Sequence, residues 1–507
     1  MALLNSFLSW WMKKRIHQIE LFLKYPHDVQ QDVFQKLIQS AQNTEWGKKY
    51  SYSDIKNPKQ FKERFPVMNY DAFKPWIQRV MQGEQNIIWN TEIKWFAKSS
   101  GTTSDKSKFI PVSKEAIEDC HFKGAKDLLS IYCNNHPDTN LFDGKGLTLG
   151  GSNQINSLSN DSFSGDISAI LIKNLPNWAD IIRTPDMSIA LMDDWEEKIK
   201  KMAEATAYED VTNISGVPTW TLVLAKRILE ITGKKNLLEV WPNLELFIHG
   251  AVSFVPYHEQ FERLIPSDDM HYVETYNASE GFFGIQDRED LSELLLMLDY
   301  GIFYEFMPME EYGKEHPRTV GLEDVVTEKN YALVISTNGG LWRYLIGDTI
   351  KFTCLSPYRI KITGRTKHYI NAFGEEVIVD NAENALQIAC EKTNSLVRDY
   401  TVAPVYISEN ANGAHEWLIE FERPPVSLEF FSEVLDNALK SLNSDYEAKR
   451  YNDLALRKPI ITLLPENTFF NWLKAKGKLG GQHKVPRLSN DRKIAEEILE
   501  MLKVKVS

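Results

Sequence analysis

A change of pattern at Gly364 and Arg365 constrains the fold most. Before it, short apolar segments follow one another closely, at 301–308, 331–336, 341–346, 350–354 and 359–362, with the tightest turn at Asn338-Gly-Gly340. Short runs bounded by turn residues are typical of antiparallel strands. After it, helical segments alternate with a hairpin. Because 507 residues are also too many for one ordinary core, we expect two domains, residues 1–365 and 366–507.

The large domain combines helices with buried strands. Apolar residues recur at helical spacing, which predicts helices at 2–23, 28–41, 113–129, 195–205, 219–231 and 291–298. Buried strands are expected at 244–248 and 331–335, so this part should be an α/β body with extensive sheet. The first helix is amphipathic, and binding to a membrane surface is an alternative for it. A Gly-rich turn and a polar run at 148–166 predict a functional or mobile loop.

The small domain is predicted to be α+β, with roughly 140 residues, an ordinary domain size. Helices are expected at 380–392, 427–442 and 493–502. Strands at 400–407 and 416–422 should form a hairpin that turns at Asn412-Gly413. The predicted fold class is therefore α/β, with a large multi-sheet N-terminal domain and a small α+β C-terminal domain.

Charge and cysteine usage exclude several classes of protein. The formal net charge of -12 argues against a nucleic-acid partner, because backbone binding requires a basic face. No window approaches the roughly 18 consecutive apolar residues of a membrane span. The N-terminal charges follow the apolar run, whereas a signal peptide has them first. The four cysteines are widely separated, which fits buried thiols in a reducing compartment, so we expect a cytoplasmic protein.

The segment 95–111 has the composition of a phosphate-binding loop. Hydroxyl groups of Ser100, Thr102 and Thr103 surround Gly101, and Lys108 supplies positive charge. Exposed amides and hydroxyls can surround phosphate oxygens while a lysine neutralises their charge. It is not a Walker A loop, which has glycine immediately before its lysine. The alternative is an ordinary polar surface loop.

Two further segments carry carboxylates after short strands. In the first, Glu280 could hold Mg²⁺ while Tyr276 stacks on a base. In the second, Asp348 follows a glycine at a strand end and is well placed to accept ribose hydroxyls. A solvated glutamate and a turn aspartate are the alternatives.

Two glycine-containing segments suggest movement. Gly364 and Gly374 flank the domain junction and could absorb a hinge rotation, with Arg365 reaching the ribose. Near the C-terminus, the Gly480-Gly481 pair predicts a flexible loop that carries Lys484 into another site. A plain linker and a solvated basic loop are the alternatives.

These elements occur in the order found in the acyl-adenylate-forming superfamily. Within it the sequence resembles the acyl acid amido synthetases of the Gretchen Hagen 3 family over nearly its whole length. The resembling runs are Thr44-Glu-Trp-Gly-Lys-Lys-Tyr50, Ser99-Ser-Gly-Thr-Thr-Ser-Asp-Lys-Ser-Lys108, Tyr276-Asn-Ala-Ser-Glu280, Tyr344-Leu-Ile-Gly-Asp348, Gly364-Arg365 and His483-Lys-Val-Pro-Arg487.

The resemblance implies a two-step, ATP-dependent reaction. A carboxylic acid attacks the α-phosphorus of ATP, giving an acyl-adenylate and pyrophosphate, and an amine, such as that of an amino acid, then displaces AMP. The implied roles are as follows: Ser100, Gly101, Thr102, Thr103 and Lys108 hold phosphates, Glu280 binds Mg²⁺, Tyr276 stacks on adenine near Gly250 and Ala251, Asp348 and Arg365 hold the ribose, and Lys484 is catalytic.

One residue departs from the family pattern, and two other functions stay open. Asp105 stands where the family loop usually has glycine, and its charge would repel triphosphate unless it points outward or pairs with Lys106. A ligase that forms thioesters with coenzyme A would share every motif. A nucleotide-binding module without turnover would also fit. The acid is expected to be aromatic or aliphatic, because the segment 149–220 contains the pocket candidates Phe163, Trp178 and Trp220.

Overall fold

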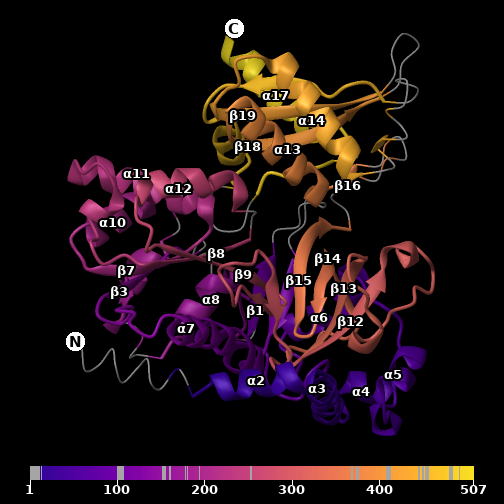
Figure 1. Ribbon diagram of the computed structural model, residues 1–507. Helices are drawn as coiled ribbons and strands as arrows, with labels where there is room; N and C mark the ends of the chain where they lie inside the picture. Colours follow the sequence, from indigo (N-terminus) through magenta and orange to yellow (C-terminus); the bar gives the residue numbers. More distant parts are fainter. Residues whose placement is uncertain are drawn as a thin grey trace.

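The protein consists of a large mixed α/β domain and a smaller domain beside it (Figure 1). The computed structural model describes residues 12, 14–99, 108–150, 156–158, 161–176, 179, 181–192, 194–251, 254–366, 369–370, 372, 375, 377–406, 413–443, 446–447, 450, 456–478, 484–489 and 491–506. Within these residues, no helix combines the length and apolar character needed to cross a membrane.

An eleven-stranded sheet organises the large domain. Its order is β12-β13-β14-β15-β11-β10-β9-β8-β7-β3-β6. Pairing is antiparallel from β12 to β9 and parallel from β9 to β6, so the two halves meet at β9 (His271–Ala278). The other strands are β3 (Lys145–Thr148), β6 (Arg183–Thr184), β7 (Val211–Ser215), β8 (Leu246–Gly250), β10 (Gly281–Ile285), β11 (Leu294–Leu296), β12 (Ile302–Pro308), β13 (Asn330–Thr337), β14 (Tyr344–Leu355) and β15 (Tyr358–Arg365).

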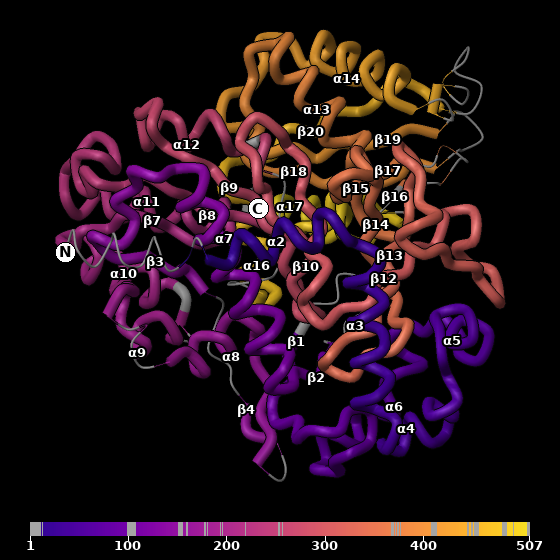
Figure 2. The backbone as a smooth tube through the Cα atoms, turned by 60° about the horizontal axis from the view of Figure 1, so that its bottom comes forward, coloured from indigo at the N-terminus to yellow at the C-terminus, as the bar shows by residue number. Residues whose placement is uncertain are grey.

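The N-terminal helices cover the antiparallel half. With the bottom of the molecule brought forward, α2 and α3 cross in front of these strands (Figure 2). Gln30 of α3 donates to the carbonyls of Leu298 and Ile302, at 2.8 and 3.0 Å, which fixes the helix against the start of β12. The helices are α2 (Ile16–Lys24), α3 (Pro26–Ala41), α4 (Glu45–Lys49), α5 (Pro58–Arg64) and α6 (Tyr70–Met81).

A second sheet has four strands, two of which come directly before and after residues 100–107 in the sequence. Its order is β2-β1-β5-β4, and β1 pairs antiparallel with β2 and parallel with β5. The backbone amide of Phe109 in β2 donates to the Tyr70 hydroxyl at 2.8 Å, which ties this sheet to α6. The strands are β1 (Trp95–Ser99), β2 (Lys108–Val112), β4 (Asn156–Ser157) and β5 (Phe163–Gly165).

Helices cover both faces of the parallel half. In Figure 1, α11 and α12 lie on the side of β7 and β8 that faces the small domain, and α7 and α8 lie on the other side. Local signals fix α11, which begins at Pro218 and ends before Gly233 in the left-handed conformation. The helices are the π-helix Ala116–Phe122, α7 (Lys123–Asn135), α8 (Ile167–Lys173), α9 (Met187–Ala190), α10 (Trp195–Thr206), α11 (Pro218–Thr232) and α12 (His258–Leu264).

The small domain has its own core on both faces of a three-stranded sheet. The sheet order is β18-β19-β20. Trp417 of β19 packs with α13 and α14, and its neighbour Leu418 packs with α16 and α17, because successive strand residues face opposite sides. The elements are β16 (Tyr369–Ile370), β17 (Val377–Ile378), α13 (Val379–Thr393), β18 (Leu396–Val405), β19 (Ala414–Arg423), α14 (Leu428–Leu442), β20 (Ile460–Leu464), α16 (Thr468–Ala475) and α17 (Lys493–Val506).

The structure confirms the predicted fold class and most of the predicted elements. The antiparallel run from 301 to 365, the turn at Asn338-Gly-Gly340 and the pairing of β18 with β19 are present. Asn412 lies outside the described residues, as do most residues of the expected N-terminal helix before Ile16.

Three predicted boundaries are wrong. The segment 291–298 is not a helix; it contains β11, because a short run that is buried on both faces of a sheet has no distinguishing period. The predicted strands 341–346 and 350–354 are replaced by one long strand, β14, which begins only at Tyr344. The expected loop 153–166 contains β4 and β5, which join the second sheet.

A buried ion pair joins the sheet to the N-terminal helices. Arg343 precedes β14, and its guanidinium donates to both carboxylate oxygens of Glu305 in β12 at 2.9–3.2 Å. It also donates to the carbonyls of Lys62 and Phe65 at the end of α5. Both side chains are almost completely buried.

We expect the Glu305→Gln variant to lose about 3–5 kcal/mol of unfolding free energy, because it leaves a buried guanidinium without its counter-charge. Denaturant titration followed by tryptophan fluorescence measures the change. The matched control is Glu310→Gln, which removes an exposed pair with Lys329 and should leave the midpoint nearly unchanged. Equal midpoints for the two variants would contradict the prediction.

Candidate active site

A large cavity lies between the two domains. Its volume is about 1870 Å³, which exceeds that of an ordinary small-molecule pocket. Its lining includes the carboxyl ends of β3, β7, β8 and β9 and residues 484–487 of the small domain. In sheets with parallel strands, ligands bind outside the carboxyl ends of the strands. The position of this cavity therefore follows from the topology of the sheet.

Asp348 is the most constrained carboxylate in the cavity. Its oxygens accept hydrogen bonds from the Tyr276 hydroxyl at 2.7 Å and from Arg365 Nε at 2.8 Å. Asp348 and Arg365 are register partners on β14 and β15. The register between β13 and β14 shifts at this level, and Gly347 has a φ of 98°, which favours glycine. The irregularity re-aims the strand just before Asp348.

Tyr276 is buried on β9. Its ring centroid lies 4.7 Å from that of Phe283, and burial together with the Asp348 carboxylate raises the pKa of its hydroxyl well above the ordinary value. The hydroxyl therefore remains protonated and donates to Asp348. Asp348 retains further lone pairs for a ligand, because each carboxylate oxygen can accept two hydrogen bonds.

Glu280 lies in the turn between β9 and β10 and also lines the cavity. Burial raises its pKa, and the positive charge of Lys108 opposes that effect. Lys108 begins β2, and its amine lies 5.8 Å from the centre of the Tyr70 ring. The charge of Lys108, the first described residue after the segment 100–107, therefore acts on Glu280.

Gly250 and Ala251 form the end of β8. A side chain at Gly250 would place its Cβ 2.5 Å from the carbonyl oxygen of Thr275 in β9, so only glycine fits this approach. Ala251 has a φ of 72°, a region that L-residues other than asparagine and aspartate rarely adopt. Its carbonyl accepts a hydrogen bond from Lys484 Nζ, so the small domain contacts the large one inside the cavity.

Backbone and side-chain bonds to β18 hold the segment that carries Lys484. The amide of Val402 donates to the carbonyl of Arg487 at 2.8 Å, and the Thr401 hydroxyl donates to the carbonyl of Pro486 at 2.6 Å. Arg487 pairs with Asp399 and lies 4.6 Å from the centre of the Tyr400 ring. These contacts fix the direction in which Lys484 leaves the small domain.

The environment of Lys484 favours its neutral form. Enclosure between the domains and the positive charges of Arg365 and Arg487 lower its pKa to about 7, although Asp348 opposes this shift. The side chain remains exposed to the cavity. Below about pH 7 the amine is charged, and above it the amine is neutral. Phosphate oxygens in the cavity would add negative charge and favour the charged form.

The structure brings most of the predicted site residues together. Gly250, Ala251, Tyr276, Glu280, Asp348, Arg365 and Lys484 all line this cavity. Lys108 is not among the lining residues, although its positive charge acts on Glu280. Ser100, Gly101, Thr102, Thr103 and Asp105 lie outside the described residues.

The residues expected in the acyl pocket do not all line the cavity. Trp220 lines the cavity, as do the apolar side chains of Leu149, Ile167, Leu171 and Val223. Phe163 instead packs against Trp95 in the second sheet, with 5.1 Å between ring centroids. Trp178 lies outside the described residues. The expectation for Phe163 is therefore wrong, because β5 pairs with β1 and carries its side chain onto that sheet.

The sequence assigned no role to Glu274, which lines the cavity, or to the side chain of Tyr344 at the start of β14. Burial raises the pKa of Glu274 to about 7, against the opposing charge of Lys361, so this carboxyl group can give or take a proton near neutrality. The Tyr344 hydroxyl is fully buried and has no hydrogen-bond partner among the described residues. The available signal for Glu274 was its place two residues before Tyr276 on the same predicted motif. Tyr344 gave none, since tyrosine is common in strands.

The large mixed sheet and the smaller α+β domain form a fold that is also found in 2-hydroxyisobutyryl-CoA ligase in its postadenylation state, with a TM-score of 0.56 at 10% identity over 97% of this chain and 91% of that chain. Family models match in the same order as the domains: the GH3 family N-terminal domain at residues 15–270, the central domain at 295–365 and the C-terminal domain at 380–493. The chain belongs to the GH3 family.

Individual relatives match over nearly their whole length. Indole-3-acetic acid-amido synthetase GH3.3 of Arabidopsis thaliana is 24% identical, over 94% of this chain and 91% of the relative. The 4-substituted benzoates-glutamate ligase GH3.12 of the same plant is 22% identical, over 93% and 94%. Among solved structures, the GH3.15 acyl acid amido synthetase superposes with a TM-score of 0.80 at 16% identity, covering 96% of each chain.

In the unliganded protein, the amine of Lys484 should titrate near pH 7, whereas an ordinary lysine titrates at roughly 10.4. Carbon NMR of reductively methylated protein measures this, and the resonance missing from a Lys484→Arg variant supplies the assignment. In an Asp348→Asn variant the midpoint should fall further, because that carboxylate favours the charged amine. An ordinary midpoint in the unsubstituted protein would rule out the described environment.

Proposed function

We propose that this GH3 family protein is an ATP-dependent, AMP-forming ligase. It adenylates a carboxylic acid, releases pyrophosphate, and then transfers the acyl group to an amine, that of an amino acid, to form an amide. The observation that carries the proposal is Lys484 of the small domain reaching the Ala251 carbonyl in a cavity that also holds Asp348 and Arg365. That arrangement provides a mobile cation beside a potential ribose site.

The nucleoside is assigned to the ends of β8, β9 and β14. Asp348, held by Tyr276 and Arg365, has the lone pairs to accept ribose hydroxyls, and Arg365 can donate to the ribose oxygens. The close approach of β8 and β9 at Gly250 leaves a flat backbone surface for adenine beside Ala251 and Tyr276. Because the Tyr276 hydroxyl is already bonded to Asp348, adenine would contact the ring and not the hydroxyl.

The phosphates are assigned to the side of the cavity where β2 begins. Ser100, Gly101, Thr102, Thr103 and Lys108 would hold them, and Glu280 would hold Mg²⁺, whose charge offsets that of the phosphate oxygens. The fit of Glu280 is supported by its position beside Lys108 and by a pKa that burial raises, since a bound cation would relieve the cost of burying the carboxylate.

The acid is assigned to the apolar part of the cavity. Leu149, Ile167, Leu171, Trp220 and Val223 would surround an aromatic or aliphatic chain. The relatives, whose names include indole-3-acetic acid and 4-substituted benzoates with glutamate, support an acid of this kind and an amino acid acceptor. Coenzyme A and amino acids would be supplied in separate reactions and the products identified. A thioester product would contradict the proposal, and an amide product would support it. A cytoplasmic location belongs to the proposal, supported by four free thiols.

Lys484 is assigned to the adenylation step. As the carboxylate attacks, negative charge develops on the α-phosphate oxygens, and a cation placed there stabilises the transition state more than the substrates.

Replacing Lys484 with Ala should lower acid-dependent ATP–pyrophosphate exchange by about a hundredfold or more, the usual effect of losing one such donor. The matched control is Lys474→Ala, since Lys474 is also a lysine at the domain interface but pairs with exposed Glu196 away from the cavity. The control should exchange at the normal rate. Normal pyrophosphate exchange by the Lys484→Ala variant would contradict the assigned role.

We also propose that the small domain, residues 366–507, rotates about Arg365 between the two half-reactions. The contacts between the domains include ion pairs of partly exposed side chains, Arg263 with Glu422 at 2.8 Å and Arg423 with Glu259 at 3.5 Å, beside the aromatic contact of Phe470 with Trp220. Exposed ion pairs contribute little stability and can exchange for water. Rotation would remove Lys484 and admit the amine.

Crosslinking the domains in the observed pose should preserve pyrophosphate exchange and abolish amide formation. Arg263→Cys and Glu422→Cys would be joined by a short bismaleimide in a Cys354→Ser, Cys390→Ser background, because those two native thiols are partly exposed. Each single-cysteine variant, treated with the same reagent, should retain both activities. Equal loss of both activities, or full amide formation after crosslinking, would rule out the rotation.

A further inference from the structure

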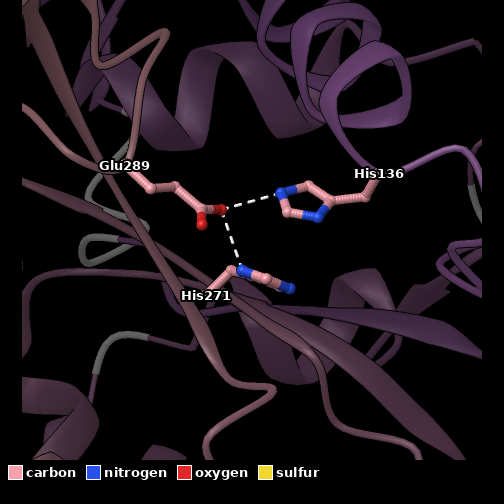
Figure 3. A group of neighbouring side chains, drawn as sticks. All are labelled: His136, His271 and Glu289. Carbon is pink, nitrogen blue, oxygen red and sulfur yellow. Dashed lines mark hydrogen bonds and ion pairs between the residues drawn. The ribbon is translucent and has the colours of Figure 1, made fainter.

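Two imidazole rings and a carboxylate converge at the amino end of β9 (Figure 3). Glu289 Oε1 lies 2.7 Å from His136 Nε2 and 2.8 Å from His271 Nδ1. The two rings are 3.9 Å apart between centroids and are tilted by 41°. One nitrogen of each ring and one carboxylate oxygen lie within 4.8 Å of one another. The three side chains come from segments that are distant in sequence.

The backbone around this cluster is already fixed. His136 follows α7 directly, and its amide donates to the carbonyl of Tyr132 at 2.8 Å. The His271 amide donates to the carbonyl of Glu245 at 2.9 Å. The loop that carries Glu289 is tied to α7 by the Asn135 side chain, which donates to the carbonyl of Asp287 at 2.9 Å.

The side chains nevertheless retain room to adjust. Their exposed fractions are 24%, 22% and 41% for His136, His271 and Glu289. Tetrahedral zinc with bonds of about 2.0–2.1 Å places its ligand atoms roughly 3.3 Å apart. The two distances from Glu289 to the ring nitrogens would each lengthen by about half an ångström on binding, which the exposed Glu289 side chain permits.

We propose that His136, His271 and Glu289 form a binding site for one divalent transition-metal ion of the zinc class. Two imidazole nitrogens and one carboxylate oxygen match the donor preference of zinc, cobalt and nickel, whereas magnesium prefers an all-oxygen set. Three protein ligands leave a coordination position open to solvent, and His271 and Glu289 also border the cavity.

The charges around the cluster suit a cation. The Glu289 carboxylate lies against both rings, and the negative charge of Glu245 also acts on His271. A cation would replace the hydrogen bonds that Glu289 now accepts from the two rings and would satisfy both carboxylate charge and ring lone pairs.

This site is separate from the proposed ATP site. Both include β9, but His271 is its first residue and Tyr276 lies five residues later, which is about 16 Å along a strand. A bound ion would connect the end of α7, the start of β9 and the β10–β11 loop. Binding to the folded protein alone should stabilise it.

The test uses chelator-treated, full-length protein in excess Mg²⁺ without nucleotide. Binding of Co²⁺ is measured by visible absorption, and binding of Zn²⁺ by calorimetry. We expect one site and a higher thermal midpoint with Zn²⁺. His136→Gln and His271→Gln should each weaken binding at least tenfold and abolish the midpoint shift, while His136→Gln keeps pyrophosphate exchange. Glu289→Gln should also weaken binding.

The matched control is His17→Gln, which removes a histidine that pairs with exposed Glu20 at 3.4 Å without a second imidazole. It should bind both metals as the unsubstituted protein does. Circular dichroism of the metal-free variants separates a lost ligand from a lost fold. The proposal is overturned if the unsubstituted protein binds neither ion, or if the folded His136→Gln and His271→Gln variants bind with unchanged affinity.

Discussion

The ion pair between Asp348 and Arg365 determines how the cavity and the domain junction are related. Asp348 also accepts from Tyr276, so a single carboxylate joins β9, β14 and the last residue of β15. Because the chain leaves the large domain immediately after Arg365, the junction lies at the edge of the cavity and not on a distant surface. The Thr366 amide donates to the carbonyl of Gly347 at 2.8 Å, which continues the connection by one residue. Any rotation of the small domain about this point changes what faces Asp348.

Positive charge is concentrated where the small domain enters. Arg365, Arg487 and Lys484 act on one another, and the two arginines keep their charge while the lysine amine loses part of its own. Arg487 is compensated by Asp399, Glu383 and the face of Tyr400, whereas the contacts of Lys484 among the described residues are the Ala251 carbonyl and the more distant charge of Asp348. A polyanionic ligand such as the proposed nucleotide would add counter-charge beside this amine.

The sequence predicted the local elements and the polar motifs but not their long-range pairing. Pro218 and Gly233 mark both ends of α11, and the motifs around Tyr276, Asp348, Arg365 and Lys484 identified residues of one cavity. The strand β11 was missed because three buried leucines have no distinguishing period. The pairing of Asp348 with Arg365 depends on strand register, and the meeting of His136, His271 and Glu289 depends on three separate segments. Local spacing holds no information on either.

The two domains differ in how they are held internally and how they are held together. The small domain packs Trp417 on one side of its sheet and Leu418 on the other, so its core is complete without the large domain. Contacts between the domains include partly exposed ion pairs, the hydrogen bond from Arg487 to the Tyr257 hydroxyl at 3.3 Å, and the aromatic contact of Phe470 with Trp220. Hydration replaces much of what is lost when exposed ion pairs separate. A small domain with its own core can therefore move Lys484 as one body, whereas motion of the lysine loop alone would break its bonds to β18.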